Sequence, residues 1–526
     1  MPVDDVDAVV VGSGPNGLVA AALLARAGWS VTVLERAEVA GGAVRSEALT
    51  VPGYVHDTFS AFYGLLHASP VLTQLELDRR VRWASFEIPA SASVGPESVA
   101  LCHADAMATA AALSALDPHD GESWSELSAW WTRVGRRFLD MCLWPLPSPG
   151  PTLRLLRAAG ARGGMELAQM MLSPVDALAQ RLFRSEPARA LLASGTSHGD
   201  LSVATAGSTP ASLVLAMAAQ EVNMPVPVGG AGRLAEALVG CVTEAGGAVV
   251  TGREVTRVVV EAGRAVAVET AAGEAVRARR AVLADLPPGR LFRSLVGEDH
   301  LPPSFLEGLR AFRHGSGVFK LDLALDGPVP WLGEGLDRCG VVHLTGHLDT
   351  MVRSASEVHR GALPALPLLV VGQQSLVDPT RAPPGCHTLW VETHVPSTPH
   401  ADGLDRVPAG SWEEAAPGFT ARVLERLEEH APGLRSRIVG RATHTPVDLE
   451  RANPNLVGGD LGGGSSALDQ QLFFRPVPGW FRYTTPVRGL YLCSASAHPG
   501  GGVHGMVGRN CAQRVLRAGR RDGRRR

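Results

Sequence analysis

The chain has 526 residues, more than the roughly 250–300 residues at which one hydrophobic core usually divides, so two domains are expected. Hydrophobic residues make up 45% and charged residues 19%, as in an ordinary globular protein, and a net charge of -3 gives no reason to expect a nucleic-acid partner. The start, Met1–Asp5, is acidic and leads straight into an apolar run, so no secretory signal is expected.

The remaining composition points to a cytoplasmic protein. No run of about 18 apolar residues is free of charges or glycine breaks, so no membrane span is expected. The seven cysteines are scattered without a C-x-x-C pair. This spacing argues against a disulfide framework, a zinc site and a redox-active disulfide.

The first elements are a strand at residues 7–11, a glycine turn, a helix to about residue 27, and a second strand at residues 31–34. The turn reads Gly12, Ser13, Gly14, Pro15, Asn16, Gly17. Its first glycine permits the tight turn, its second lets a pyrophosphate approach the backbone, and its third lets the helix pack on the sheet. The start of the helix offers free N–H groups and a positive dipole end to phosphates. These elements predict a Rossmann-type dinucleotide cradle.

The residues after the second strand indicate which dinucleotide binds. Glu35 ends the strand, where its carboxylate can accept hydrogen bonds from a ribose diol. Arg36 follows, and then comes a glycine doublet with an arginine: Gly41, Gly42, Ala43, Val44, Arg45. An arginine fork pairs two phosphate oxygens at once, so this segment suits the second side of a pyrophosphate. We therefore predict FAD rather than NAD, against the alternative of a solvated surface turn.

Residues 124–167 stand out by composition. Four of the ten tryptophans, at positions 124, 130, 131 and 144, fall within 21 residues, and leucines and arginines follow a proline-rich break. Such a segment can form the helical core of a substrate domain. It can also lie on an anionic membrane and admit a lipid-like substrate. Both interpretations stay open, so peripheral membrane contact remains an alternative.

A second glycine-rich segment, residues 229–232, opens a predicted helix at residues 233–245. Four strands then follow at residues 248–251, 255–261, 265–270 and 275–284. Gly263 and Gly273 lie between them at positions that suit hairpin turns.

Two positions in later predicted strands are candidates for chemistry. Lys320 is the only lysine in the chain, within the alternating segment 316–323. A lysine held away from water can serve as a base, although pairing with Asp322 is the structural alternative. His394 ends a strand and is a second candidate acid–base group, with a structural histidine as its alternative. His343 and His347 are four residues apart, but the Thr345-Gly346 pair between them disfavours a helical zinc site.

Near the C-terminus, a strand beginning at Gly489 enters a turn of small residues, and a helix follows at residues 506–516. Such a turn lets the backbone approach a planar ring without side-chain obstruction. The residues we expect to meet the flavin are Ser496, His498, Gly501, Gly502 and Val503.

With these motifs in view, the chain resembles the phytoene desaturase-like branch of the FAD-dependent oxidoreductases, which includes carotenoid desaturases and isomerases. It is most similar to the pyridine nucleotide-disulfide oxidoreductase domain-containing protein 2 group. The matching segments span the whole length: residues 11–21, 41–45, 56–57, 225–234, 455–460 and 489–508.

The resemblance implies an α/β fold: a Rossmann-type FAD-binding domain, like that of glutathione reductase and the amine oxidases, built from discontinuous segments. Those segments are residues 1–75, 225–290 and 440–526. Residues 76–224 and 291–439 would form a mixed-sheet substrate domain with a helical cap. The resemblance also implies that Val255 meets the adenine region through its backbone, and that Lys320 lies near the reactive flavin edge, as in the amine oxidases.

The expected function is removal of a hydride from a largely apolar small molecule, giving a C=C bond, with dioxygen or a quinone as the acceptor of electrons. Three alternatives stay open: an amine or amino-acid oxidase, a flavin-binding interaction protein without turnover, and redox-neutral chemistry such as isomerisation. The sequence does not determine the oligomeric state.

Overall fold

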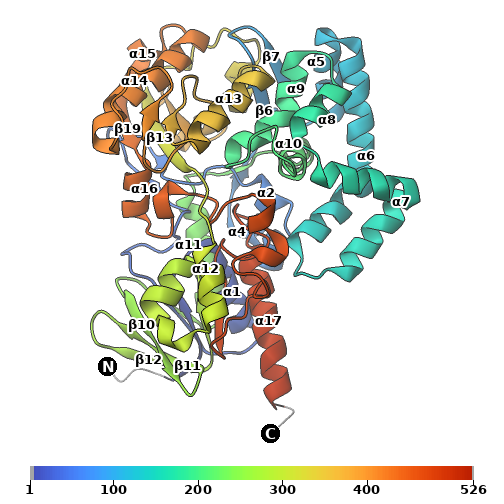
Figure 1. The fold of residues 1–526 in the computed structure, drawn as a ribbon. Coiled ribbons are helices and arrows are strands. Elements are labelled where there is room, and N and C mark those ends of the chain that lie inside the picture. The colour runs from blue at the N-terminus through green and yellow to red at the C-terminus, as the bar shows by residue number, and fades with distance from the viewer. Residues whose placement is uncertain (1–4, 524–526) are drawn as a thin grey trace.

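The computed structural model describes residues 5–523, apart from the side chains of residues 161, 162 and 521–523. Residues 1–4 of the acidic start lie outside this range. The described residues form two lobes, each built around a seven-stranded sheet, with a group of helices beside the upper lobe (Figure 1).

The first sheet belongs to the lower lobe of Figure 1. Its strands are β9 (Ala248–Val250), β2 (Val31–Leu34), β1 (Val6–Val11), β12 (Ala275–Ala284), β20 (Leu490–Leu492), β11 (Arg264–Thr270) and β10 (Val255–Glu261). The first five strands run parallel in that order. Strand β12 connects the parallel and the antiparallel parts of this sheet. Its first half pairs antiparallel with β11, and its second half pairs parallel with β1 and β20. The valines of β1 are buried, as expected for a central strand covered by helices on both faces.

The helices on this sheet are α1 (Pro15–Arg26), α11 (Gly232–Glu244) and α17 (Met506–Gly523). The predicted strand–turn–helix–strand order is therefore confirmed. Strands β10 and β12 have the predicted bounds, and β9 and β11 differ by one residue at one end. Gly263 and Gly273 adopt φ angles of 72° and 77° in the two hairpin turns, a conformation that glycine takes without steric cost.

The second sheet lies in the upper lobe and is mixed. Its strands, in spatial order, are β19 (Ile438–His444), β13 (Gly317–Leu325), β17 (His387–Val395), β16 (Leu369–Gly372), β14 (Cys339–Leu344), β6 (Ile88–Ser93) and β7 (Val99–Cys102). Only the β14–β6 pair is parallel. The outer face of this second sheet carries Phe319, Leu321 and Leu323, which share an apolar core with Phe419 of α14 (Trp412–His430).

The helices of the cap lie beside β6 and β7. They are α5 (Ala106–Leu116), α6 (Pro118–Leu143), α7 (Pro149–Leu172), α8 (Val175–Leu182), α9 (Glu186–Ala193) and α10 (Thr209–Val222). Trp124 and Trp131 of α6 are buried, and their indole N–H groups donate to Gln220 and Glu221 of α10 at 2.7 and 2.6 Å. These two tryptophans form the helical core of the cap. Leu153 and Leu156 of α7 are exposed, and a membrane-contacting role for this helix stays a prediction.

Shorter elements complete the fold. The helices are α2 (Gly64–His67), α3 (Val71–Gln74), α4 (Leu77–Arg80), α12 (Pro303–Arg310), α13 (Leu348–His359), α15 (Leu434–Arg437) and α16 (Pro446–Ala452). The strands are β3 (Ser46–Glu47), β4 (His56–Asp57), β5 (Trp83–Ala84), β8 (Val226–Pro227), β15 (Ala362–Leu363) and β18 (Ala401–Asp402).

The strands of the first sheet all come from segments expected to form the FAD-binding domain. The predicted boundary at residue 440 assigns most of β19 to the FAD-binding domain. In the structure, however, β19 pairs with β13 of the second sheet. The division into domains remains a proposal, and we place this boundary after β19.

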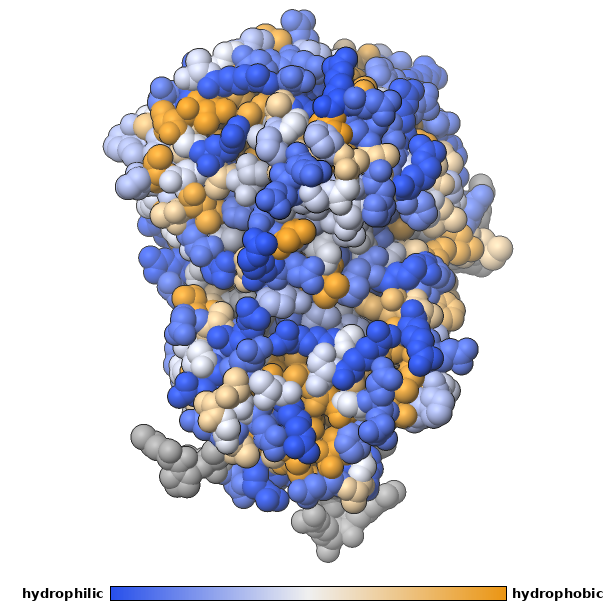
Figure 2. Space-filling model, turned by 60° about the vertical axis from the view of Figure 1, so that its left-hand side comes forward, coloured by the Kyte–Doolittle hydropathy of each residue, from blue (hydrophilic) through white to orange (hydrophobic). Residues whose placement is uncertain are grey.

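Among residues 5–523, no helix is long and apolar enough to cross a membrane. On the face drawn in Figure 2, hydrophilic residues dominate, and the largest apolar group lies low, at the height of the first sheet.

Candidate active site

A cleft lies at the carboxyl ends of β1 and β2, where an open α/β sheet binds its ligand. It has an empty volume of about 710 Å³. Seven predicted cofactor-binding residues line it: Gly12, Gly14, Glu35, Arg36, Gly42, Arg45 and Val255. Residues far apart in the chain also line it without having been predicted: Arg253, Glu254, Leu286, Arg290 and residues 452–455.

Glu35 is held in a fixed orientation. Its Oε2 accepts hydrogen bonds from the backbone N–H of Ser13 at 2.8 Å and the Ser13 hydroxyl at 2.7 Å. Its Oε1 accepts from the backbone N–H of Ala37 at 2.8 Å. A carboxylate has about four lone-pair sites and three are used here, so Oε1 can still accept from a ribose hydroxyl.

The glycine turn packs against a residue that was not predicted from the sequence. Asp285 follows β12, and its Oδ2 accepts from the backbone N–H of Gly17 at 2.9 Å. A Cβ atom on Gly14 would lie 2.5 Å from that oxygen, so position 14 admits only glycine without rearrangement. Burial raises the pKa of Asp285 to about 7. The signal that could have identified it is the end of a parallel strand next to β1.

Other predicted residues do not line the cleft, and two of them, Gly41 and Asn16, are buried. Gly41 is buried with a φ of 128°, and its N–H donates to the Ser13 carbonyl at 3.1 Å. Asn16 accepts at Oδ1 from the Gly508 N–H of α17 at 3.4 Å. Pro15 is the first residue of α1, and Ala43 is half-buried just after the doublet.

The C-terminal turn packs on a further glycine-rich segment, residues 458–464. The Ser496 hydroxyl donates to the Gly463 carbonyl at 2.7 Å, and the buried Arg475 guanidinium donates to Ala495 at 2.9 Å. Gly501 and Gly502 are exposed and Val503 is half-buried, so this turn presents backbone to solvent. His498 is buried and donates from Nε2 to the Trp144 carbonyl at 2.9 Å, and burial lowers its pKa to about 4.

These residues fit FAD. The glycine turn and arginines suit an anionic pyrophosphate, the oriented Glu35 suits a ribose, and the exposed backbone at Gly501 and Gly502 suits a flat ring. Four arginines line the cleft: Arg36, Arg45, Arg253 and Arg290.

Several titratable side chains lie together on one face of the second sheet. The register pairs Lys320 with Glu392 and Asp322 with Trp390, and residues directly opposite one another point to the same face. This face packs against the N-terminal segment expected to belong to the FAD-binding domain, because the Trp390 indole N–H donates to the Phe59 carbonyl at 3.2 Å.

Lys320 is 1% exposed and pairs with Asp322, which is itself completely buried. The pairing that the sequence left open is therefore present. The Lys320 ammonium also lies 5.8 Å from the centre of the Trp390 ring. Glu392 is buried across the strand from Lys320, and burial raises its pKa to about 8.

His394 is half-buried on the same face, and its Nδ1 lies 2.8 Å from the Ser316 hydroxyl. Burial lowers the pKa of His394, so the ring is neutral near pH 7. His343 reaches this face from β14, whereas His347 precedes α13, so the two do not share a helix face. Within residues 5–523 no group of three metal-ligating side chains is positioned to hold an ion.

Comparison with known proteins gives the family. The family described as flavin containing amine oxidoreductase matches residues 16–393. The chain belongs to this family. FAD is therefore its cofactor, and the α/β fold with a Rossmann-type FAD-binding part is confirmed.

The chain is also similar to individual proteins along nearly its whole length. It is 32% identical to the pyridine nucleotide-disulfide oxidoreductase domain-containing protein 2 of Mus musculus, over 97% of this chain and 93% of that one. It is 25% identical to one polypeptide of the limonene dehydrogenase of Castellaniella defragrans, over 97% and 94%. It is 26% identical to a neurosporene-forming phytoene desaturase of Cereibacter sphaeroides, over 96% and 94%.

Among solved structures, an oxidoreductase from Methanosarcina mazei matches with a TM-score of 0.63 at 17% identity, covering 97% of this chain and 99% of that one. This likeness supports the fold. The predicted resemblance to phytoene desaturase-like FAD oxidoreductases is confirmed by these comparisons.

Proposed function

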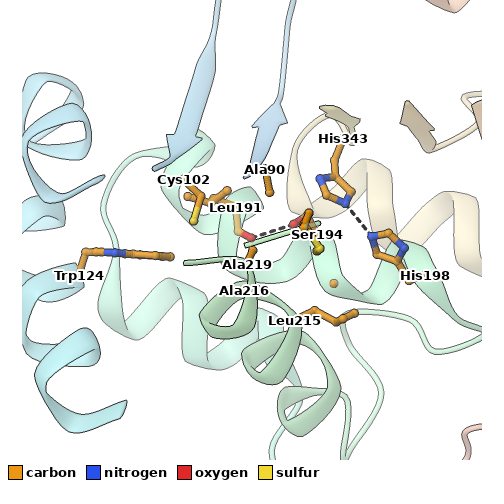
Figure 3. A pocket seen from close by; sticks show the side chains of 12 residues that line it. Ala90, Cys102, Trp124, Leu191, Ser194, His198, Leu215, Ala216, Ala219 and His343 are labelled. Atoms are coloured by element: carbon orange, nitrogen blue, oxygen red, sulfur yellow. Dashed lines mark hydrogen bonds between the residues drawn. The ribbon is translucent and has the colours of Figure 1, made fainter. Parts of the chain in front are cut away.

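We propose that the protein removes a hydride from a largely apolar small molecule and leaves a C=C bond, with dioxygen or a quinone as the final acceptor. The observation that carries this proposal is a small, mostly apolar pocket in the upper lobe, where the cap meets strands β6 and β14 of the second sheet (Figure 3). Lys320 and His394 lie on the same face of that sheet but do not line the pocket. Relatives named for limonene and phytoene support the same substrate class.

When bound, FAD supplies the hydride acceptor. The residues of this chain have the other tasks: they hold the donor carbon, keep water out and receive one proton from the neighbouring carbon. We propose His394 as the acceptor of this proton, and Lys320 as a second acceptor when its pair with Asp322 is in the neutral form. Both lie on the sheet face that packs against the N-terminal segment at Phe59, and the neutral His394 ring has a nitrogen able to accept a proton.

A second candidate function is oxidation of an amine or amino acid. Two observations favour it. Lys320 is buried beside Trp390, and the matching family is described as flavin containing amine oxidoreductase. For such a reaction, a Lys320→Met substitution should abolish flavin reduction by amines and the accompanying release of peroxide.

The two functions are separated by mixing the FAD-loaded protein anaerobically with apolar terpenoid hydrocarbons or with primary amines, and following the loss of visible flavin absorption. Bleaching by hydrocarbons, with no dependence on amines, is the expected result. Bleaching by amines alone would overturn the desaturase proposal in favour of an amine oxidase. No bleaching by either class, while a protein partner binds the tryptophan-rich cap, would favour an interaction protein.

A further inference from the structure

Exposed large hydrophobic side chains are concentrated in two segments of the chain. Sixteen such side chains among residues 5–523 are exposed by 41% or more, and eight of them lie in α7 or in residues 468–474. None of the eight lines the cofactor cleft or the pocket of the upper lobe. Folded proteins seldom expose apolar side chains in one group, and such a group marks contact with a membrane or with another protein.

Helix α7, at the outer edge of the cap, presents apolar side chains to solvent in both of its halves (Figure 1). In the first half, Leu153 and Leu156 are exposed, whereas Leu155 between them is completely buried. The two exposed leucines are three residues apart and therefore share one side of the helix. In the second half, Met165 and Leu172 are exposed and share one side because they are seven residues apart.

The two halves of α7 meet at a kink. Gly160 has a φ of 74°, which interrupts the helix. A Cβ atom on Gly164 would lie 3.3 Å from Cδ2 of Leu156. Since Gly164 precedes Met165, the exposed side chains of the first half adjoin those of the second.

The second segment, residues 468–474, adjoins the end of α7. The Leu172 carbonyl accepts from the Gly207 N–H at 3.1 Å. A Cβ atom on Gly207 would lie 2.7 Å from Cδ2 of Leu468, so a single glycine separates the two segments. Three more exposed side chains follow Leu468: Leu472, Phe473 and Phe474. Together, α7 and residues 468–474 form one surface, which we call the apolar edge.

Cations lie beside the apolar edge without acidic partners. Arg154 and Arg157 are exposed next to the leucines of α7. Arg482 lies over Phe481, 5.1 Å from its ring centre, and Phe481 contacts the exposed Phe473. Within the part of the chain that the structure describes, none of these three guanidinium groups forms an ion pair.

The charge of the apolar edge favours an anionic partner. Residues 149–172 contain three arginines and one glutamate. Asp469, the acidic residue of the second segment, pairs with Arg313 at 2.9 Å. Unpaired guanidinium groups complement phosphate, whereas a second copy of this chain would bring like charges together. A surface of phosphate groups over hydrocarbon therefore fits better than self-association.

We propose that the apolar edge docks on a membrane that contains anionic phospholipids. Its leucine, methionine and phenylalanine side chains enter the boundary between headgroups and acyl chains, and its unpaired guanidinium groups bind lipid phosphates. The edge also borders the turn expected to meet the flavin, because a Cβ atom on Gly500 would lie 3.7 Å from Oε1 of Gln471. The docking itself does not depend on the proposed function.

The test measures binding of the FAD-loaded protein to vesicles by flotation. One set of vesicles is phosphatidylcholine alone, and the other contains about one third phosphatidylglycerol, on which the wild type should bind about a hundredfold more tightly. Raising the salt from about 0.1 M to about 1 M should remove most of this preference, because the ions screen the arginine charges.

Two double variants assign the binding to the apolar edge. Leu153→Gln with Leu156→Gln should weaken binding to the anionic vesicles about tenfold or more, because apolar surface no longer enters the bilayer. Arg154→Gln with Arg157→Gln should lower the preference for anionic vesicles about tenfold or more. Equal thermal unfolding of the variants and the wild type shows that all of them fold.

The matched control is Leu332→Gln with Leu366→Gln. These leucines lie outside the apolar edge and are 46% and 43% exposed, against 47% and 45% for Leu153 and Leu156. The control should bind vesicles as the wild type does.

A wild type that binds neither kind of vesicle would overturn the inference. Equal binding by the α7 leucine variant and its control would also overturn it, and would assign membrane binding to another part of the chain. A dimer in sedimentation that only the α7 leucine variant loses, without vesicle binding, would make this surface an interface between copies instead. Docking that depends on α7, in a protein whose flavin no donor bleaches, would uphold this inference and overturn the proposed function.

Discussion

At the scale of single residues, the cradle places a carboxylate where an anion is expected to bind. Asp285 accepts from the Gly17 N–H, one of the groups that the first turn of α1 offers to a pyrophosphate. Burial raises its pKa to about 7, so the side chain is largely protonated below that pH and becomes charged above it. The charged form would repel a bound pyrophosphate, so we predict that Asp285 lowers FAD affinity as it ionises.

We predict that FAD binds the wild type more weakly as the pH rises from 6 to 8, because Asp285 ionises in this window. The Asp285→Asn variant should lose this dependence and bind FAD about threefold to tenfold more tightly than the wild type at pH 8. The measurement is the dissociation constant of FAD at each pH, from quenching of flavin fluorescence. An equal slope with pH in both proteins would contradict the assignment.

The sign of the effect on stability follows from the same pKa. Since the folded protein holds the Asp285 proton up to about pH 7, while an unfolded aspartate loses it near pH 3.8, this residue contributes stability at low pH. That contribution is lost as the pH rises from about 4 to 7. Asp285→Asn should flatten the corresponding slope of the unfolding free energy of the FAD-free protein.

At the scale of elements, strand β13 carries a fully buried ion pair. Lys320 and Asp322 are two residues apart on one strand face, and both are buried. Removing one member of a buried pair leaves the other charge unpaired, which costs far more than the pair contributes.

Lys320→Met should therefore lower the unfolding free energy by about 3–5 kcal/mol, because Asp322 remains buried without its partner. The matched double variant, Lys320→Met with Asp322→Leu, should recover most of this loss. Denaturant unfolding of the three proteins checks the prediction. If the single variant were as stable as the wild type, the buried pairing would be wrong.

The same elements show what the sequence could predict. Strands β10 and β12 have the predicted bounds because alternation and the turn glycines Gly263 and Gly273 are local signals. The register between β13 and β17 is not local. That Lys320 faces Glu392 depends on where two segments about 70 residues apart meet, so the sheet face that gathers the site emerged only from the structure.

At the scale of the whole molecule, one buried arginine ties segments of both proposed domains together. The guanidinium of Arg381 donates to Asp57 at 2.6 Å, to Asp378 at 2.7 Å and to the Pro227 carbonyl at 3.1 Å. Asp57 and Pro227 come from segments expected in the FAD-binding domain, and Arg381 comes from the substrate segment. This link joins segments of the two proposed domains and restrains their relative position.

Arg381→Met should leave Asp57 and Asp378 without their cation and lower the unfolding free energy by about 3–5 kcal/mol. Arg381→Lys should restore only part of the stability, because an ammonium cannot reproduce the guanidinium fork. Thermal unfolding of the FAD-loaded proteins measures both. Full stability in Arg381→Met would show that this link does not join the two lobes.

The candidate site is also a property of the whole molecule, and this limited its prediction. The glycines, Glu35 and Arg45 could be identified because the cradle is continuous in sequence. Asp285 lies 268 residues from Gly17, and His198 lies 145 residues from His343, so no local pattern encodes either contact. The signals that predict a fold are short-range, whereas the groups that complete a site are brought together by the fold.

The most direct test of the account is the visible absorption spectrum of the purified protein after incubation with excess FAD and removal of the unbound cofactor. The wild type should show flavin bands, and acid precipitation should tell noncovalent from covalent FAD. Gly14→Ala should lose the bands, because its Cβ would lie 2.5 Å from Asp285. Gly95→Ala, in an open hairpin turn where the nearest atom would be 3.9 Å away, should keep them. A wild type without flavin bands, or a Gly14→Ala variant with undiminished ones, would contradict the account.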